Sequence, residues 1–96
     1  MLRRDEILQK LQVQQDEMRV RFSVRRIGLF GSYLQGTASE TSDIDLLVDF
    51  AEPTFDHYMD LKFYLEGLFE RPVDLVLSDT IKPRLKPVIQ KEVAYA

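Results

Sequence analysis

The sequence predicts a small α/β domain of the α+β kind, in which a small mixed β-sheet carries helices mainly on one face. Two observations support this class. Three short runs rich in Val, Ile, Leu and Phe have the alternation that is typical of strands, at residues 24–30, 43–50 and 73–77. The segments around them carry apolar residues at spacings of three and four, as amphipathic helices do. The expected order is αβ(α)βαβα, with residues 1–96 forming a single domain.

Helical spacing places a first helix from Arg4 to about Arg21. Its apolar positions are Ile7, Leu11, Met18 and, just beyond it, Phe22. After the first strand, the residues that follow Ser32 are expected to form a short helix. These two helices flank the first strand on either side in the sequence.

Capping residues and prolines bound the later helices. Thr54 is a candidate N-cap for a helix that ends near Arg71-Pro72, because the residue before a proline disfavours the helical conformation. The last regular helix is expected at 85–94, since an interior proline would break a hydrogen bond and Pro87 therefore belongs near its start.

Composition and charge narrow the function classes. With 45% apolar and 30% charged residues, the chain is typical of a folded globular domain. A net charge of −3 argues against a domain whose main role is binding nucleic acid directly. The absence of cysteine excludes disulfides, thiolate zinc sites and cysteine nucleophiles. A charged N-terminus and the lack of a long apolar run predict a cytoplasmic protein without membrane association.

Three aspartates interrupt otherwise apolar strands. Asp43 and Asp45 are one residue apart, so a strand would direct both to one face with Cα atoms roughly 6.6 Å apart. Asp74 interrupts the third strand in the same way, and it would converge with them if these strands are neighbours. Like charges so close are costly unless a cation neutralises them, and carboxylates suit Mg²⁺ or Mn²⁺. The pattern therefore predicts a divalent-metal site.

Gly31-Ser32 follows the first strand and predicts a phosphate-binding turn. A glycine at a strand end leaves backbone N–H groups free and lets a phosphate approach, and the serine hydroxyl is a further donor. Taken singly, Gly-Ser is more often only a turn and Asp-x-Asp often arises by chance. The next residue, Tyr33, suits either stacking on a base or filling the space behind the turn.

The stretch GSYLQGTASETSDIDLLVDF, residues 31–50, resembles the Gly-Ser, Gly, Ser-Asp-x-Asp signature of the DNA polymerase β-like nucleotidyltransferase superfamily. Within it, the chain is similar to the minimal nucleotidyltransferases that form the antitoxin half of HEPN/MNT toxin–antitoxin pairs. The resemblance covers nearly the whole chain, including the VDLV strand and the closing KPVIQKEVAYA. It implies the polymerase β-like nucleotidyltransferase fold.

The resemblance also implies a role for each motif residue. Gly31 and Ser32 match the positions that hold the β and γ phosphates of ATP, and Asp43 and Asp45 match the pair of Mg²⁺ ligands, with Mn²⁺ as the alternative ion. Asp74 matches the third catalytic carboxylate, which helps to place the metal and deprotonates the acceptor hydroxyl. The chain differs from many relatives immediately before Gly36, where it has Gln35 in place of an arginine.

The implied function is transfer of AMP from ATP to a tyrosine hydroxyl of a cognate HEPN-domain ribonuclease toxin, which would make the chain its antitoxin. A chain of 96 residues also has little room for an acceptor-binding domain, which favours a separate protein partner. Two alternatives remain open. One is a binding antitoxin that covers its partner and has a vestigial nucleotide site, and the other is an enzyme acting on a small hydroxylated molecule.

Overall fold

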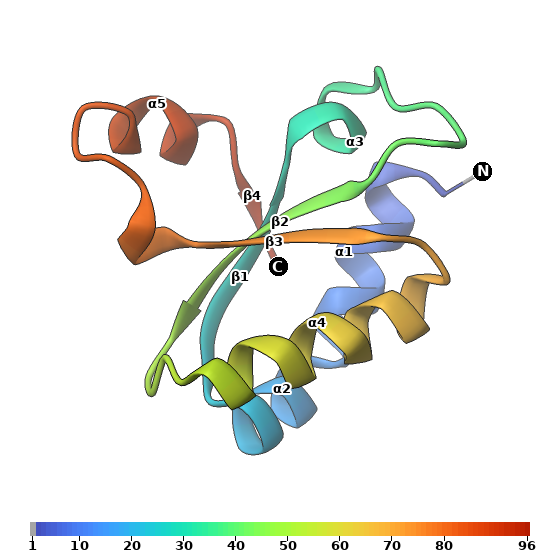
Figure 1. Ribbon diagram of the computed structural model, residues 1–96. Helices are drawn as coiled ribbons and strands as arrows, with labels where there is room; N and C mark the ends of the chain where they lie inside the picture. Colours follow the sequence, from blue (N-terminus) through green and yellow to red (C-terminus); the bar gives the residue numbers. More distant parts are fainter. Residues whose placement is uncertain (1) are drawn as a thin grey trace.

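A four-stranded mixed sheet forms the centre of the fold in the computed structural model, which describes residues 2–96 (Figure 1). The strands, in sheet order, are β3 (Val73–Leu77), β2 (Ile44–Phe50), β1 (Val24–Phe30) and β4 (Ala94–Tyr95). β1 is antiparallel to both of its neighbours, β2 and β4, whereas β2 and β3 are parallel. The expected α+β class with a mixed sheet is confirmed.

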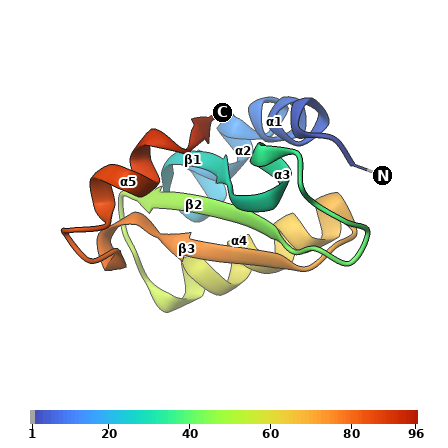
Figure 2. The same cartoon turned by 90° about the horizontal axis from the view of Figure 1, so that it is seen from above.

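Helices lie on both faces of this sheet but most of the helical chain covers one of them. That face carries α1 (Arg4–Val13), α2 (Gln15–Phe22) and α4 (Phe55–Phe69) (Figure 1). The short helices α3 (Gly31–Gln35) and α5 (Lys86–Lys91) lie on the other side, and a 3₁₀ turn, η1 (Ser78–Thr80), precedes α5 (Figures 1 and 2). Among the described residues, none of these helices has the length and apolarity needed to cross a membrane.

The main core forms between the sheet and the three larger helices. It joins alternate residues of the strands to the apolar faces of α1, α2 and α4, with members that include Ile27, Leu29, Ile44, Leu46, Val48, Val73, Leu75, Ile7, Leu11, Met18, Phe22, Leu61, Leu65 and Phe69. The remaining alternate side chains of β2 and β3, which include Asp45 and Asp74, point to the other face of the sheet. The predicted strand parities are therefore confirmed, because core burial of one set of side chains fixes the direction of the other.

The first helix differs from the expectation of one helix over residues 4–21. It is divided at Gln14, whose backbone (φ −94°, ψ 6°) leaves the helical region. The Gln14 side chain accepts a hydrogen bond from the Tyr64 hydroxyl of α4. Phe22 then packs on the same tyrosine with 5.2 Å between ring centroids. The change of direction at Gln14 thus accompanies packing of α2 against α4, a contact between distant segments that helical periodicity does not reveal.

The C-terminal helix is also shorter than predicted. The expectation was a helix over 85–94, whereas α5 ends at Lys91 and the chain then forms β4. Gly28 of β1 makes this possible, because a Cβ at that position would lie 2.4 Å from Val93 Cγ1. The missing side chain allows the C-terminal segment to lie across β1, where the Ala96 N–H donates to the Ile27 carbonyl at 3.0 Å. Pairing with the sheet replaces the last turn of the expected helix.

The middle of the chain follows the sequence-based expectations, apart from a shift of one residue at the start of β2. β2 begins at Ile44 rather than 43, and its first N–H donates to the Pro72 carbonyl at 3.0 Å. Thr54 caps α4, since its hydroxyl accepts from the backbone N–H of His57 at 3.1 Å. The helix ends before Arg71-Pro72, with Glu70 in the left-handed conformation.

Candidate active site

The turn between β1 and α3 has a conformation that favours glycine. Gly31 has φ +73°, a region that residues with a side chain rarely adopt. α3 extends only to Gln35, and Gly36 ends it with φ +79°. Two glycines therefore fix the start and the end of a single helical turn, and its first backbone N–H groups face the strand ends of β1 and β2.

The carboxylate of Asp45 packs directly against Gly31. A Cβ placed on Gly31 would lie 2.1 Å from Asp45 Oδ2 and 2.9 Å from its carboxyl carbon, so no larger residue fits. The backbone N–H of Ser32 lies near enough to the same carboxylate to favour its charged form, which acts to lower the pKa of Asp45. The predicted phosphate-binding turn and one of the predicted metal ligands are therefore in direct contact.

The parallel pairing of β2 with β3 brings Asp74 to Asp45. The two residues are cross-strand partners, and the neighbouring Asp74 carboxyl raises the pKa of Asp45. Asp43, immediately before β2, is close enough for its charge to act on Asp45. Asp43 and Asp74 are exposed and Asp45 is half-buried. The structure thus brings together all three predicted carboxylates, and it places them beside Gly31 and Ser32.

The electrostatics of Asp45 reflect this crowding. Its pKa is raised, first because burial disfavours the charged form, then because of the negative charges of Asp74 and Asp43. The Ser32 N–H acts in the opposite direction by stabilising the carboxylate. None of the ion pairs among the described residues involves these carboxylates. The site therefore concentrates negative charge that its own basic residues do not neutralise.

This arrangement suits a hard divalent cation by its chemistry. Carboxylate oxygens are preferred ligands of Mg²⁺, and a cation would relieve the repulsion that raises the pKa of Asp45. Within residues 2–96, however, no three Asp, Glu, His or Cys side chains are arranged around one point as a closed coordination site. The Asp45 carboxylate lies instead against Gly31.

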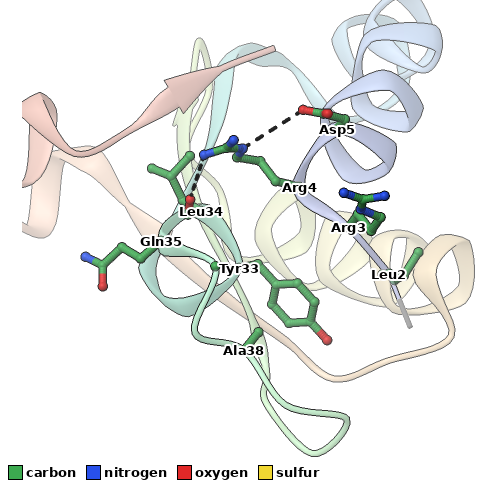
Figure 3. Close-up of a pocket in the computed structure, with 9 residues that line it drawn as sticks. Leu2, Arg3, Arg4, Asp5, Tyr33, Leu34, Gln35 and Ala38 are labelled. Carbon is green, nitrogen blue, oxygen red and sulfur yellow. Dashed lines mark hydrogen bonds and ion pairs between the residues drawn. The ribbon is translucent and has the colours of Figure 1, made fainter.

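Tyr33 belongs to the buried core and not to the exposed carboxylate group. Tyr33 is only 3% exposed, so it fills the space behind the turn and is not a free stacking platform. It lines a cavity of about 550 Å³ together with the start of α1 and the end of α3, including Gln35 (Figure 3). Arg4 donates from Nη1 to the Leu34 carbonyl at 3.1 Å. An arginine from α1 therefore lies beside Gln35, although no local pattern linked residues 30 positions apart.

Comparisons with known proteins agree with the site. Residues 11–96 match the family described as "Nucleotidyltransferase domain". The chain is 44% identical over 96 residues to the protein adenylyltransferase MntA of Thermococcus cleftensis, a match that covers 99% of this chain and 97% of that protein.

Solved structures share the fold. One, assigned provisionally as a minimal nucleotidyltransferase, has a TM-score of 0.74 and 35% identity, and the match covers 91% of this chain and 93% of that one. Another is a toxin–antitoxin complex with AMP-PNP, with a TM-score of 0.69 and 25% identity, covering 88% of this chain and 70% of that one. The resemblance in residues 31–50 is thus confirmed as a family relationship.

Substitution of Gly31 is expected to disturb the site more than substitution of the other glycine with positive φ. Gly31→Ala adds a collision with Asp45 to the backbone strain, whereas Gly36→Ala has strain only, because no atom lies within 4 Å of its Cβ position. The free energy of unfolding should fall for both, by about 1 kcal/mol for Gly36→Ala and by more for Gly31→Ala. Urea denaturation measures both values.

Gly67→Ala is the matched control, since it lies in α4 with open space at its Cβ position. It should raise the free energy of unfolding by about 0.5–1 kcal/mol. Equal losses for the variants at positions 31 and 36 would contradict the contact between Asp45 and the turn.

Asp45→Asn should stabilise the protein in metal-free buffer. The amide keeps an acceptor for the Ser32 N–H and can donate to Asp74, while the repulsion is removed. Cross-strand pairs contribute about 0.2–1 kcal/mol, and about 1 kcal/mol shifts the Tm of a domain this size by about 4–8 °C. We therefore expect a Tm about 1–8 °C above wild type at pH 7.

The pH dependence of the Tm is a second test of whether Asp45→Asn stabilises the protein. Because the pKa of Asp45 is raised in the native protein, the native wild type holds the carboxyl proton of Asp45 more tightly than the unfolded chain does. The stability of the wild type therefore falls as the pH rises from the pKa of the unfolded chain through the native pKa. The Tm difference between Asp45→Asn and wild type should therefore be small near pH 4 and grow toward pH 7. Asp49→Asn is the control, because Asp49 pairs with Arg26 across the sheet and its loss should give no such gain.

Proposed function

The chain belongs to the nucleotidyltransferase family, and from this premise we propose that it is a metal-dependent protein adenylyltransferase. In this proposal it transfers AMP from ATP to a tyrosine hydroxyl of a cognate HEPN-domain ribonuclease toxin and so acts as its antitoxin in the cytoplasm. The observation that carries the proposal is the packing of the Gly31-Ser32 turn against Asp45, which is itself paired with Asp74. Phosphate donors and charge-bearing carboxylates are adjacent, as a nucleotidyl transfer requires.

Each site residue has a distinct part in this proposal. Gly31 lets the triphosphate approach the backbone, and Ser32 donates its N–H and hydroxyl to phosphate oxygens. Asp43, Asp45 and Asp74 would hold Mg²⁺, with Mn²⁺ as an alternative. When bound, the ion neutralises charge on the phosphates and stabilises charge that develops in the transition state.

The transfer itself needs one proton acceptor. The acceptor hydroxyl oxygen forms a bond to the α-phosphorus, and the bond between that phosphorus and the oxygen leading to the β-phosphate breaks. The electron pair of the broken bond leaves with pyrophosphate. Asp74 is exposed and lies on β3, the edge strand of the sheet, so it takes the proton of the incoming hydroxyl.

A protein acceptor is favoured by the exposure of the site. Asp43 and Asp74 are exposed on the sheet face that, within residues 2–96, carries the short helices α3 and α5 (Figure 1). This exposed face suits an acceptor hydroxyl presented on the surface of a second protein. The toxin–antitoxin complex with AMP-PNP and the Thermococcus adenylyltransferase support a toxin as that protein and ATP as the donor.

Incubation of the HEPN-domain toxin with this protein, ATP and Mg²⁺ should add one or more AMP units to the toxin. Intact mass spectrometry measures the increase, and peptide mapping identifies the modified side chain. The toxin should stay inactive as a nuclease after the two proteins are separated. An unmodified toxin that regains its activity on separation would show inhibition by occlusion, and the enzymatic proposal would be wrong.

Asp74→Asn should reduce this AMP transfer by about 10²-fold or more, because the proton acceptor is lost while binding surfaces are kept. The rate of toxin mass increase measures the effect. Asp49→Asn is the matched control on the same sheet face and should transfer AMP at nearly the wild-type rate. If Asp74→Asn protected cells from the toxin as well as wild type does, the carboxylates would not be the basis of neutralisation.

A further inference from the structure

The C-terminal segment of residues 81–91, which contains α5, carries exposed apolar and basic side chains that the core does not use. Leu85 is 45% exposed and Val88 is 56% exposed, and their spacing of three places them on one side of the helix. In the described part of the chain, the core and the apolar side chains packed against it include no residue between 78 and 95. The apolar character of this segment therefore serves something other than folding of the main core.

The segment also lies on the face that carries the carboxylates. Val93, just after α5, occupies the space that a Cβ of Gly28 would need, and Gly28 pairs with Leu47 of β2. Leu47 has the same strand parity as Asp45, so this contact is on the site face of the sheet. Figure 2 shows α3 and α5 at opposite ends of β2. Asp45 and Asp74 lie at the α3 end of this strand, so a protein large enough to cover the sheet face from Asp74 to the other end of β2 would contact α5.

Charge distinguishes this segment from the rest of the protein. Residues 81–91 contain four basic side chains and no acidic one, in a chain whose net charge is −3. The basic residues Lys82 and Arg84 are exposed and flank Leu85. An apolar pair with a basic rim is a surface that suits an apolar patch with an acidic rim on another protein.

We propose that α5 and the residues around it form the docking surface for the acceptor protein, with Leu85 and Val88 as the apolar centre and Lys82, Arg84 and Lys86 as the charged rim. This inference rests on the proposed function for the identity of the acceptor. A second copy of this chain fits less well, because a symmetric contact would place the basic rims against each other. Nucleic acid also fits less well, because the exposed apolar side chains of Leu85 and Val88 gain nothing from contact with phosphates.

The apolar centre is tested with Leu85→Gln/Val88→Gln, which changes no charge. Its Kd for the HEPN-domain toxin, measured by calorimetry, should rise about tenfold or more. The matched control is Val13→Gln/Val20→Gln, whose exposed side chains are on α1 and α2, the helices of the core face. The control should bind the toxin like wild type. Mg²⁺ and ATP are expected to raise the Tm of the wild type, and both variants should show the same increase.

The charged rim is tested with Lys82→Gln/Lys86→Gln. Association with the toxin should be slower and less sensitive to salt, because rim charges steer the encounter. Lys10→Gln/Lys62→Gln is the matched control, with the same charge change on α1 and α4. Equal association rates for the two variants would contradict the proposal that Lys82 and Lys86 belong to the charged rim of the docking surface.

Three results would overturn the docking proposal. The first is toxin affinity that Leu85→Gln/Val88→Gln leaves unchanged, or that the Val13/Val20 control weakens as much. The second is sedimentation of the wild type without toxin as a dimer that the α5 variant dissociates, which would identify a second copy as the occupant. The third is a wild type that does not bind the toxin. A wild type that binds through α5 but adds no AMP would instead contradict the proposed enzymatic function.

Discussion

The contact between Gly31 and the carboxylate of Asp45 is the constraint on which the site depends. A side chain at position 31 would overlap with Asp45 Oδ2, and the left-handed backbone there favours glycine as well. The same turn directs the Ser32 N–H to that carboxylate. A single residue without a side chain therefore allows a strand end, a helix start and a charged group to meet in one place.

Burial of apolar side chains on the opposite face of the sheet offsets the repulsion between these carboxylates. Alternate residues of β2, from Ile44 to Phe50, are buried against α1, α2 and α4, and they fix the parity of the strand. Slipping β2 by one residue to separate the aspartates would expose this whole apolar set. Burial on one face thus holds Asp45 beside Asp74 on the other, although their charges raise the pKa of Asp45.

The small size of the chain connects the site to its proposed partner. The large helices cover the core face, while in the described part of the chain the site face carries the short helices α3 and α5 (Figure 1). The exposed carboxylates and the exposed apolar residues of α5 therefore belong to the same side of the molecule. An acceptor protein that covers this side would complete a site that the chain itself leaves open.

The sequence by itself determined the fold class and the strand parities, and it predicted five site residues. Alternation within 24–30, 43–50 and 73–77 predicts strands because pleated backbone sends successive side chains to opposite faces, a local property. The same rule placed Asp43 and Asp45 together before any strand neighbour was known. Their catalytic roles remain predictions from the family resemblance.

The tertiary structure decided what depends on contacts between distant segments. The break at Gln14 accompanies its hydrogen bond to Tyr64, fifty residues away. β4 forms because Gly28 leaves space for Val93, so a stretch with helical spacing pairs with a strand instead. The pairing of Asp45 with Asp74 likewise required β2 and β3 to be parallel neighbours. Periodicity and capping are local signals, and they carry no information on which distant side chain will supply a partner or a space.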